Sequence, residues 1–99
     1  MIIDKLLEQE IGRNRLMQET YRAEIQTLPQ GSLSLKVQNG KTYCYLRYRK
    51  GDKVISEYAG SGENEESLRQ GIERRKHLQV MLKALEEEYE RLIKMEKVK

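Results

Sequence analysis

Tyrosine and arginine alternate along one segment of this chain, at Tyr43, Tyr45, Arg47 and Arg49. Side chains two residues apart in a β-strand project from the same side, so a strand here would present all four together. Guanidinium groups bind phosphates and the edges of guanine bases. Tyrosine hydroxyls contact sugar and phosphate oxygens, and tyrosine rings stack on unpaired bases. The pattern is typical of a nucleic-acid-binding surface, provided that the segment is a strand.

Two hairpin turns predict that it is one. Asn39-Gly40 favours a two-residue type I′ turn, and Gly51-Asp52 favours type II′. The turns separate strand-like runs over 32–37, 41–50 and 53–60. Counting outward from two-residue loops predicts one apolar side, with these pairs across the strands: Leu33 with Leu46, Leu35 with Cys44, Val37 with Thr42, Tyr48 with Ile55, and Cys44 with Ala59.

The opposite side of the predicted sheet is aromatic and basic. Lys36 falls opposite Tyr43, Tyr58 opposite Tyr45, and Ser56 opposite Arg47. The predicted binding residues are therefore Lys36, Tyr43, Tyr45, Arg47, Arg49, Ser56 and Tyr58. Two alternatives stay open. Cross-strand tyrosine pairing stiffens a small sheet without any ligand, and tyrosine and arginine also anchor protein interfaces.

Helices are expected on both sides of the sheet. Residues 1–28 carry apolar side chains at roughly helical spacing, interrupted by Gly12 and Asn14, and Pro29 ends the pattern. Residues 64–97 are expected to form a longer helix, with Asn64 as its N-cap. The expected apolar stripes comprise Ile3, Leu7, Ile11, Met17, Tyr21, Ile25 and Leu28 in the first helix, and Leu68, Ile72, Leu78, Leu82, Leu85, Tyr89 and Leu92 in the second.

From Leu78 to Leu92 the apolar steps are those of a heptad seam. The sequence thus predicts a single α+β domain over 1–99: a long helix, a three-stranded antiparallel meander over 31–60, and a long helix. The helices would pair antiparallel as a coiled-coil-like hairpin. Further apolar residues outside the seam favour a homodimer through the helices; they are Val80, Met81, Ile93 and Met95.

The net charge of +3 is unevenly distributed. Residues 29–60 hold six basic and two acidic side chains, whereas residues 61–99 hold nine of each and residues 1–28 hold four basic and five acidic. The positive charge therefore belongs to the sheet, which indicates an anionic partner such as nucleic acid. The same lysines and arginines would also keep a bare sheet soluble.

Residues suited to catalysis are scarce. His77 is the only histidine and Cys44 the only cysteine, so no Cys/His cluster exists to hold a metal. We expect no catalytic residue, no metal and no cofactor, and hence no enzyme. A membrane span is not expected, because no apolar run is long enough. Charges throughout the first residues argue against a secretory signal, and a lone cysteine fits a reducing cytoplasm.

The stretch Gly40–Gly60 resembles the N-terminal three-stranded arm-binding segment of tyrosine-recombinase integrases, leading segments of some transposases, and small prokaryotic mobile-element proteins. With the first strand included, the resembling three-stranded sheet over 31–60 covers about a third of the chain. The resemblance does not extend to a recombinase catalytic domain. In integrases this sheet lies in the DNA major groove, so the resemblance implies DNA contacts for Tyr43, Tyr45, Arg47 and Arg49.

We therefore expect a small cytoplasmic, non-enzymatic protein that binds nucleic acid, with DNA favoured, encoded by a phage or mobile element. The alternative is a protein-interaction module: an accessory, regulator or inhibitor of a nucleic-acid-processing enzyme.

Overall fold

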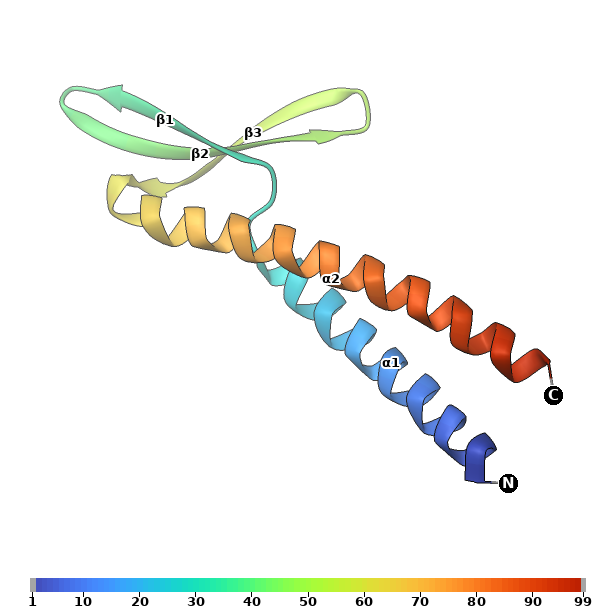
Figure 1. Cartoon of the computed structure of the whole chain (residues 1–99). Coiled ribbons are helices and arrows are strands. Elements are labelled where there is room, and N and C mark those ends of the chain that lie inside the picture. Colours follow the sequence, from blue (N-terminus) through green and yellow to red (C-terminus); the bar gives the residue numbers. More distant parts are fainter. Residues whose placement is uncertain (1, 99) are drawn as a thin grey trace. The chain divides into compact units, whose positions relative to one another are not determined.

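A computed structural model describes residues 2–98 of the chain, with side chains from Asp4 onward. Its elements are α1 (Ile2–Thr27), β1 (Ser32–Gln38), β2 (Lys41–Lys50), β3 (Lys53–Ser61), a 3₁₀ turn η1 (Gly62–Asn64) and α2 (Glu65–Lys97) (Figure 1). The predicted α+β order of helix, sheet and helix is confirmed, with element ends within a residue or two of those expected.

The chain groups into two compact units, and a single domain over 1–99 stays a prediction. Unit 1 contains α1 and the part of α2 from His77 onward, whereas unit 2 contains Leu28–Lys76. Each unit is described by itself below. Unit 2 holds the sheet and therefore all the predicted binding residues.

Unit 1 is an antiparallel helix pair, as predicted (Figure 1). Its most buried apolar side chains are Leu7, Ile11, Ile25 and Leu78. The rest of the predicted α2 seam is half-buried, at Leu82, Leu85, Tyr89 and Leu92. Burial of these side chains stabilises both helices, since neither would gain enough from intrinsic helix propensity alone. The predicted stripe residue Ile3 has a side chain outside the described part of the structure.

Polar residues complete the seam of α1. Asn14 and Gln18 are buried, with only 2% and 7% of their surface exposed. The expectation that Asn14 interrupts the pattern is wrong, because it continues the alternating four- and three-residue steps from Leu7 and Ile11. Those steps then pass through Gln18 toward Ile25. The seam of α1 is thus a regular heptad pattern with two amides in it.

The two buried amides belong to one hydrogen-bonded chain. Asn14 Nδ2 donates to the Leu85 carbonyl oxygen at 3.0 Å and to Glu88 Oε1 at 3.4 Å. Gln18 Nε2 donates to Asn14 Oδ1 at 2.6 Å, and an Arg22 guanidinium nitrogen donates to Gln18 Oε1 at 2.8 Å. A satisfied polar residue at one seam position fixes the axial alignment of paired helices. Asn14 therefore sets the register of α1 against α2.

In unit 2, β1, β2 and β3 form an antiparallel sheet in chain order. The pairing of β1 with β2 is as predicted, and so is the pairing of Tyr48 with Ile55. Asn39 and Gly40 have φ values of 52° and 76°, the left-handed pair that a type I′ turn requires. The pairing of Gln38 with Lys41 and of Lys50 with Lys53 confirms the two-residue loops expected at both hairpin tips.

A β-bulge corrects the predicted end of β3. Tyr45 pairs with Tyr58, but Cys44 pairs with Gly60, which leaves Ala59 as an extra residue between them. The predicted pairing of Cys44 with Ala59 is therefore wrong. A count outward from the turn assumes a regular ladder, whereas a bulge inserts one residue into one strand only.

The buried side of the sheet is the one predicted to be apolar. Cys44 is fully enclosed and Leu46 is buried, and Ile72 of α2 is buried in the same unit. The Cys44 thiol donates to the Ser61 carbonyl oxygen at 3.3 Å. Burial stops short of the first hairpin tip, however, since Leu35 is 41% exposed and Val37 is 69% exposed.

The segment between α1 and β1 is held closely against its neighbours within unit 2. Gly31 has a φ of 86°, and a Cβ at this position would collide with the backbone carbonyl of Arg47. Arg75 of α2 donates from a guanidinium nitrogen to the Leu28 carbonyl oxygen at 3.0 Å. Glycine is required at Gly31 both for its backbone conformation and for this close approach.

Candidate nucleic-acid interface

All seven residues predicted to bind nucleic acid lie on one side of the sheet. β2 pairs with β1 on one edge and with β3 on the other, and residues directly opposite each other in a sheet project to the same side. Lys36 is opposite Tyr43, Tyr58 is opposite Tyr45, and Ser56 is opposite Arg47, as predicted. We call this surface the Tyr/Arg face; it comprises Lys36, Tyr43, Tyr45, Arg47, Arg49, Ser56 and Tyr58.

The aromatic half of the face is a packed cluster. The ring of Tyr58 lies 5.6 Å from that of Tyr45 in an edge-on arrangement and 6.4 Å from that of Tyr43 in a tilted one. Lys36 Nζ lies 4.7 Å from the centre of the Tyr45 ring, in cation–π geometry. Lys36 therefore covers one face of the Tyr45 ring, and the Tyr58 ring packs against Tyr45 in an edge-on contact. Its hydroxyl is better suited than its ring to contact a ligand.

The basic half of the face is open. Arg47 and Arg49 are both exposed. In the described part of the chain, neither guanidinium group has an ion pair or a side-chain hydrogen bond. Residues i and i+2 of a strand are about 6.8 Å apart and project to the same side, so the two arginine side chains are neighbours on the sheet. Exposed, unpaired guanidinium groups can exchange water for phosphate oxygens at little cost.

The same side of the sheet also carries Ser32, Ser34 and Val54, which are not among the predicted binding residues. Val54 pairs with Arg49 and is 57% exposed, as is Tyr58 on the same strand. Its position was readable from the Gly51-Asp52 turn, because the same register that places Ser56 on this side also places Val54 there. An apolar side chain does not bind phosphate, so Val54 is not among the residues that phosphate-binding chemistry predicts.

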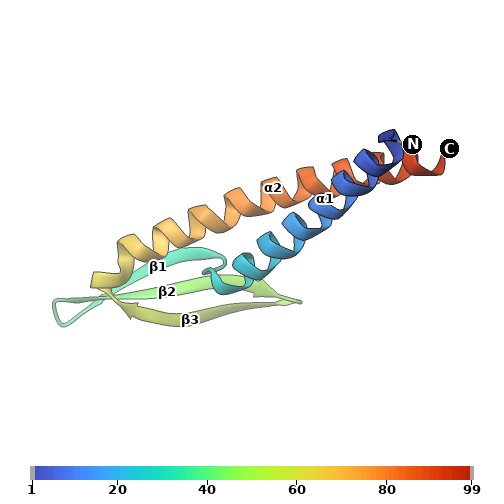
Figure 2. The same cartoon turned by 90° about the horizontal axis from the view of Figure 1, so that it is seen from below.

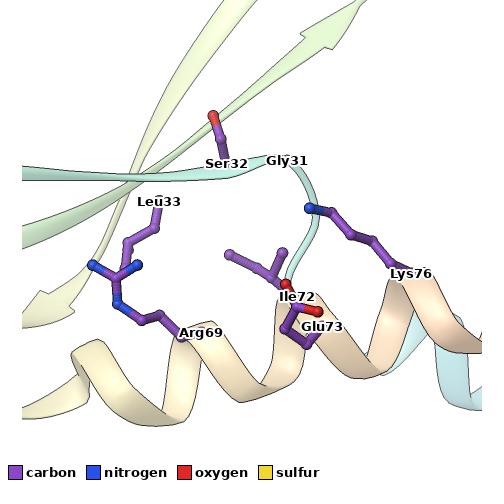
Figure 3. Close-up of a pocket in the computed structure, with 7 residues that line it drawn as sticks. All are labelled: Gly31, Ser32, Leu33, Arg69, Ile72, Glu73 and Lys76. Carbon is purple, nitrogen blue, oxygen red and sulfur yellow. The ribbon is translucent and has the colours of Figure 1, made fainter.

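A groove of about 290 Å³ lies elsewhere in unit 2 (Figure 3). It is lined by Gly31, Ser32, Leu33, Arg69, Ile72, Glu73 and Lys76. Figure 3 shows the Arg69 guanidinium group beside Leu33 and the Lys76 side chain extending toward Gly31. Leu33 belongs to the buried side of the sheet, so the groove is separate from the Tyr/Arg face. Arg69 forms an ion pair with Glu65 at 3.5 Å. The lining of the groove therefore combines the basic Arg69 and Lys76 with the acidic Glu73.

Cys44 is enclosed and hydrogen-bonded to a carbonyl, whereas His77 is exposed on α2. Across the described residues there is no group of three or more histidine, cysteine, aspartate or glutamate side chains that could hold a metal ion. None of the described helices combines the length and the apolar character that crossing a membrane requires.

Two ionisable groups outside the face have shifted pKa values. The Tyr48 hydroxyl donates to Glu57 Oε2 at 3.0 Å, and this hydrogen bond is the main reason that the pKa of Tyr48 is raised. Arg15 donates to the Tyr89 hydroxyl at 2.7 and 3.0 Å, which raises the pKa of the Arg15 guanidinium. Tyr48 lies on the opposite side of the sheet from the Tyr/Arg face, so its shift does not tune the candidate interface.

No curated protein and no solved structure matches the chain. Residues 3–70 match a family described as Domain of unknown function (DUF6788). The matched range runs from α1 through the sheet into the start of α2 and contains every residue of the Tyr/Arg face. Because the match spans more than half of the chain, this protein belongs to the DUF6788 family.

Proposed function

We propose that this chain is a small, non-enzymatic nucleic-acid-binding protein that contacts the phosphate backbone through the Tyr/Arg face. The observation that carries the proposal is the exposure of Arg47 and Arg49 as neighbours on one side of a sheet. Lys36 and three tyrosine hydroxyls lie on that same side. DNA is the favoured ligand because of the resemblance to arm-binding segments, and a mobile-element origin stays a prediction that neighbouring genes would test.

The charge distribution supports an electrostatic mode of binding. The sheet segment holds six basic and two acidic side chains, whereas the rest of the chain is close to neutral. Guanidinium groups that neutralise phosphates release condensed counterions, so binding through this face would weaken as salt is raised. The packed tyrosine cluster would supply a stiff platform and hydroxyl contacts to sugar or phosphate oxygens.

The test is titration of a generic DNA duplex with the protein over a series of salt concentrations. Replacing both arginines, Arg47→Ala with Arg49→Ala, should weaken binding. It should also make the slope of log K against log salt shallower by about 1.8, since each phosphate contact contributes about 0.9. The matched control is Lys83→Ala with Arg91→Ala, which removes the same charge from exposed positions of α2 in unit 1.

Outcomes are separable. An equal loss in both double variants would mean that net charge alone drives association. Affinity and slope that are unchanged by the Arg47 and Arg49 substitutions would refute the proposal.

A protein-interaction module is the second candidate, favoured by the apolar exposure of Val54 and Tyr58 beside the arginines. Tyrosine and arginine in a partly apolar surface are frequent anchors of protein interfaces. A partner of this kind would be retained on immobilised protein after nuclease treatment and a high-salt wash. A phosphate-mediated partner would be lost under both conditions.

A further inference from the structure

The two edges of the sheet have different surroundings within unit 2. The start of β1 shares the groove with α2 residues Arg69, Ile72, Glu73 and Lys76, and Figure 2 shows β1 next to the first turns of α2. The other edge is formed by β3, which is last in the strand order. In the described part of the chain, β3 has no strand on its outer side. The outer edge of β3 is therefore available for backbone pairing.

The turn at Gly51-Asp52 determines which backbone groups of β3 face outward. A two-residue hairpin loop is closed by a hydrogen-bonded pair, here Lys50 and Lys53. Bonded and non-bonded pairs alternate along an antiparallel ladder. The N–H and C=O groups of Val54, Ser56 and Tyr58 consequently point away from β2. The regular part of the strand ends at the bulge, at Ala59.

Side chains at these same positions are exposed. Val54 and Tyr58 are each 57% exposed, and exposed Ser56 lies between them. All three project to the Tyr/Arg side. An edge strand with unpaired backbone groups and apolar side chains at the outward-paired positions is a template for another strand. Charged residues, which commonly protect such edges, are absent from these three positions.

We propose that a second copy of this chain pairs antiparallel along β3, with the two-fold axis at Ser56, and that one continuous sheet is formed from both copies. Ser56 then faces Ser56 of the second copy, and Val54 faces Tyr58 of the second copy on both sides of the axis. Each of these residues exchanges both backbone hydrogen bonds with its opposite number. Aromatic and β-branched residues directly opposite each other stabilise a ladder.

This register is favoured over its neighbours by charge and by burial. Moving the strands two residues in one direction places Glu57 against Glu57 of the second copy, which is repulsive. Moving them two residues the other way sets the Tyr58 ring beside the Asp52 carboxylate and Val54 beside Ser56. A shift by a single residue would disrupt the match of outward-facing backbone groups. Only the register centred on Ser56 covers Val54 and Tyr58 with each other, and a two-fold interface requires such self-complementarity.

Cross-linking tests the register. In a hydrogen-bonded antiparallel pair the Cα atoms are about 5.5 Å apart, which lies within the range that a disulfide spans. Ser56→Cys should therefore form a disulfide-linked dimer under mild oxidation, whereas the matched control Ser34→Cys, on β1, should remain largely unlinked. The native Cys44 is fully enclosed and does not compete. Linking of Ser56→Cys no faster than Ser34→Cys would overturn the proposal.

Charge exchange provides the second test. The parent chain should sediment as a dimer at micromolar to millimolar concentration. Ser56→Lys and Ser56→Glu should each weaken association about tenfold or more, since like charges then meet at the axis. An equimolar mixture of the two variants should restore the dimer. Circular dichroism checks that both variants fold, and Ser34→Lys serves as the control on the other edge.

A parent chain that stays monomeric, or a dimer that Ser56→Lys leaves intact, would refute pairing along β3. The second result would instead point to the helices as the dimer surface. Neither measurement involves nucleic acid, so this inference and the proposed function fail independently.

Discussion

The buried amide of Asn14 offers a quantitative test of the helix pair. Asn14→Ala removes the donor to the Leu85 carbonyl and the acceptor that holds Gln18 Nε2 at 2.6 Å. The Leu85 carbonyl keeps its ordinary helical partner, but the Gln18 amide loses its own in a buried position. An unsatisfied buried polar group costs about 1–3 kcal/mol. The higher helix propensity of alanine returns about 0.5 kcal/mol of this.

We therefore expect Asn14→Ala to lower the free energy of unfolding by about 0.5–2.5 kcal/mol. For a chain of this size, each kcal/mol corresponds to a shift in Tm of about 4–8 °C. Urea unfolding followed by helical circular dichroism measures the change directly. Gln9→Ala is the control, because Gln9 is exposed on the same helix.

Replacing both amides separates stability from alignment. In the double variant Asn14→Leu with Gln18→Leu, no buried amide remains without a hydrogen-bond partner, and the seam of α1 becomes apolar throughout. Such paired replacements are nearly neutral or stabilising, so the double variant should be at least as stable as the parent despite losing the contacts that set the helix register. If Asn14→Ala were as harmless as Gln9→Ala, the reasoning that this network stabilises and aligns the helices would be refuted.

Two further predictions concern unit 2. Gly40→Ala should cost about 1–2 kcal/mol in unfolding free energy, because a Cβ is disfavoured at positive φ. Gly31→Ala should cost about 3 kcal/mol or more, because the added Cβ also collides with backbone atoms. Equal losses of the two variants in denaturant unfolding would contradict the close approach at Gly31. Tyr48 should ionise above the ordinary tyrosine pKa because its hydroxyl donates to Glu57. The stabilisation from this raised pKa is complete below about pH 10, the unfolded value, and is lost as pH rises through the folded pKa. Tyr48→Phe removes one tyrosine from the ultraviolet titration, and the amplitude that is lost should come from above the ordinary tyrosine pKa. Amplitude lost at the ordinary value instead would show that the hydrogen bond does not form in solution.

The sheet was predictable from sequence because its turns are chemically explicit. Asn39-Gly40 permits few backbone conformations, so a count from the turn gives the pairing of β1 with β2 and, from the second turn, the sides of Tyr45 and Arg47. The bulge at Ala59 escaped prediction, since nothing in a residue count distinguishes an extra residue from a regular one. The membership of the Tyr/Arg face survived because the bulge lies beyond Tyr58.

The helix pair was harder to predict in detail. The seam of α2 is apolar throughout and was recognised, whereas the seam of α1 was obscured by treating Asn14 as an interruption. The seven-residue spacing through Asn14 and Gln18 was present in the sequence, but a search for apolar residues alone does not find buried amides. Exposure of Leu35 and Val37 could not be anticipated either, because how far a covering element extends along a sheet depends on tertiary packing.

The extra residue in β3 also determines to which side of the sheet the residues that follow it project. Deleting Ala59 would reverse the sides of the remaining strand residues and displace the Ser61 carbonyl from the Cys44 thiol, where they now meet at 3.3 Å. The segment that leads into α2 would then start with its side chains and backbone groups pointing in the opposite directions. Within the DUF6788 family, we expect insertions to accumulate at the hairpin tips, while the spacing from Tyr58 to Glu65 stays constant.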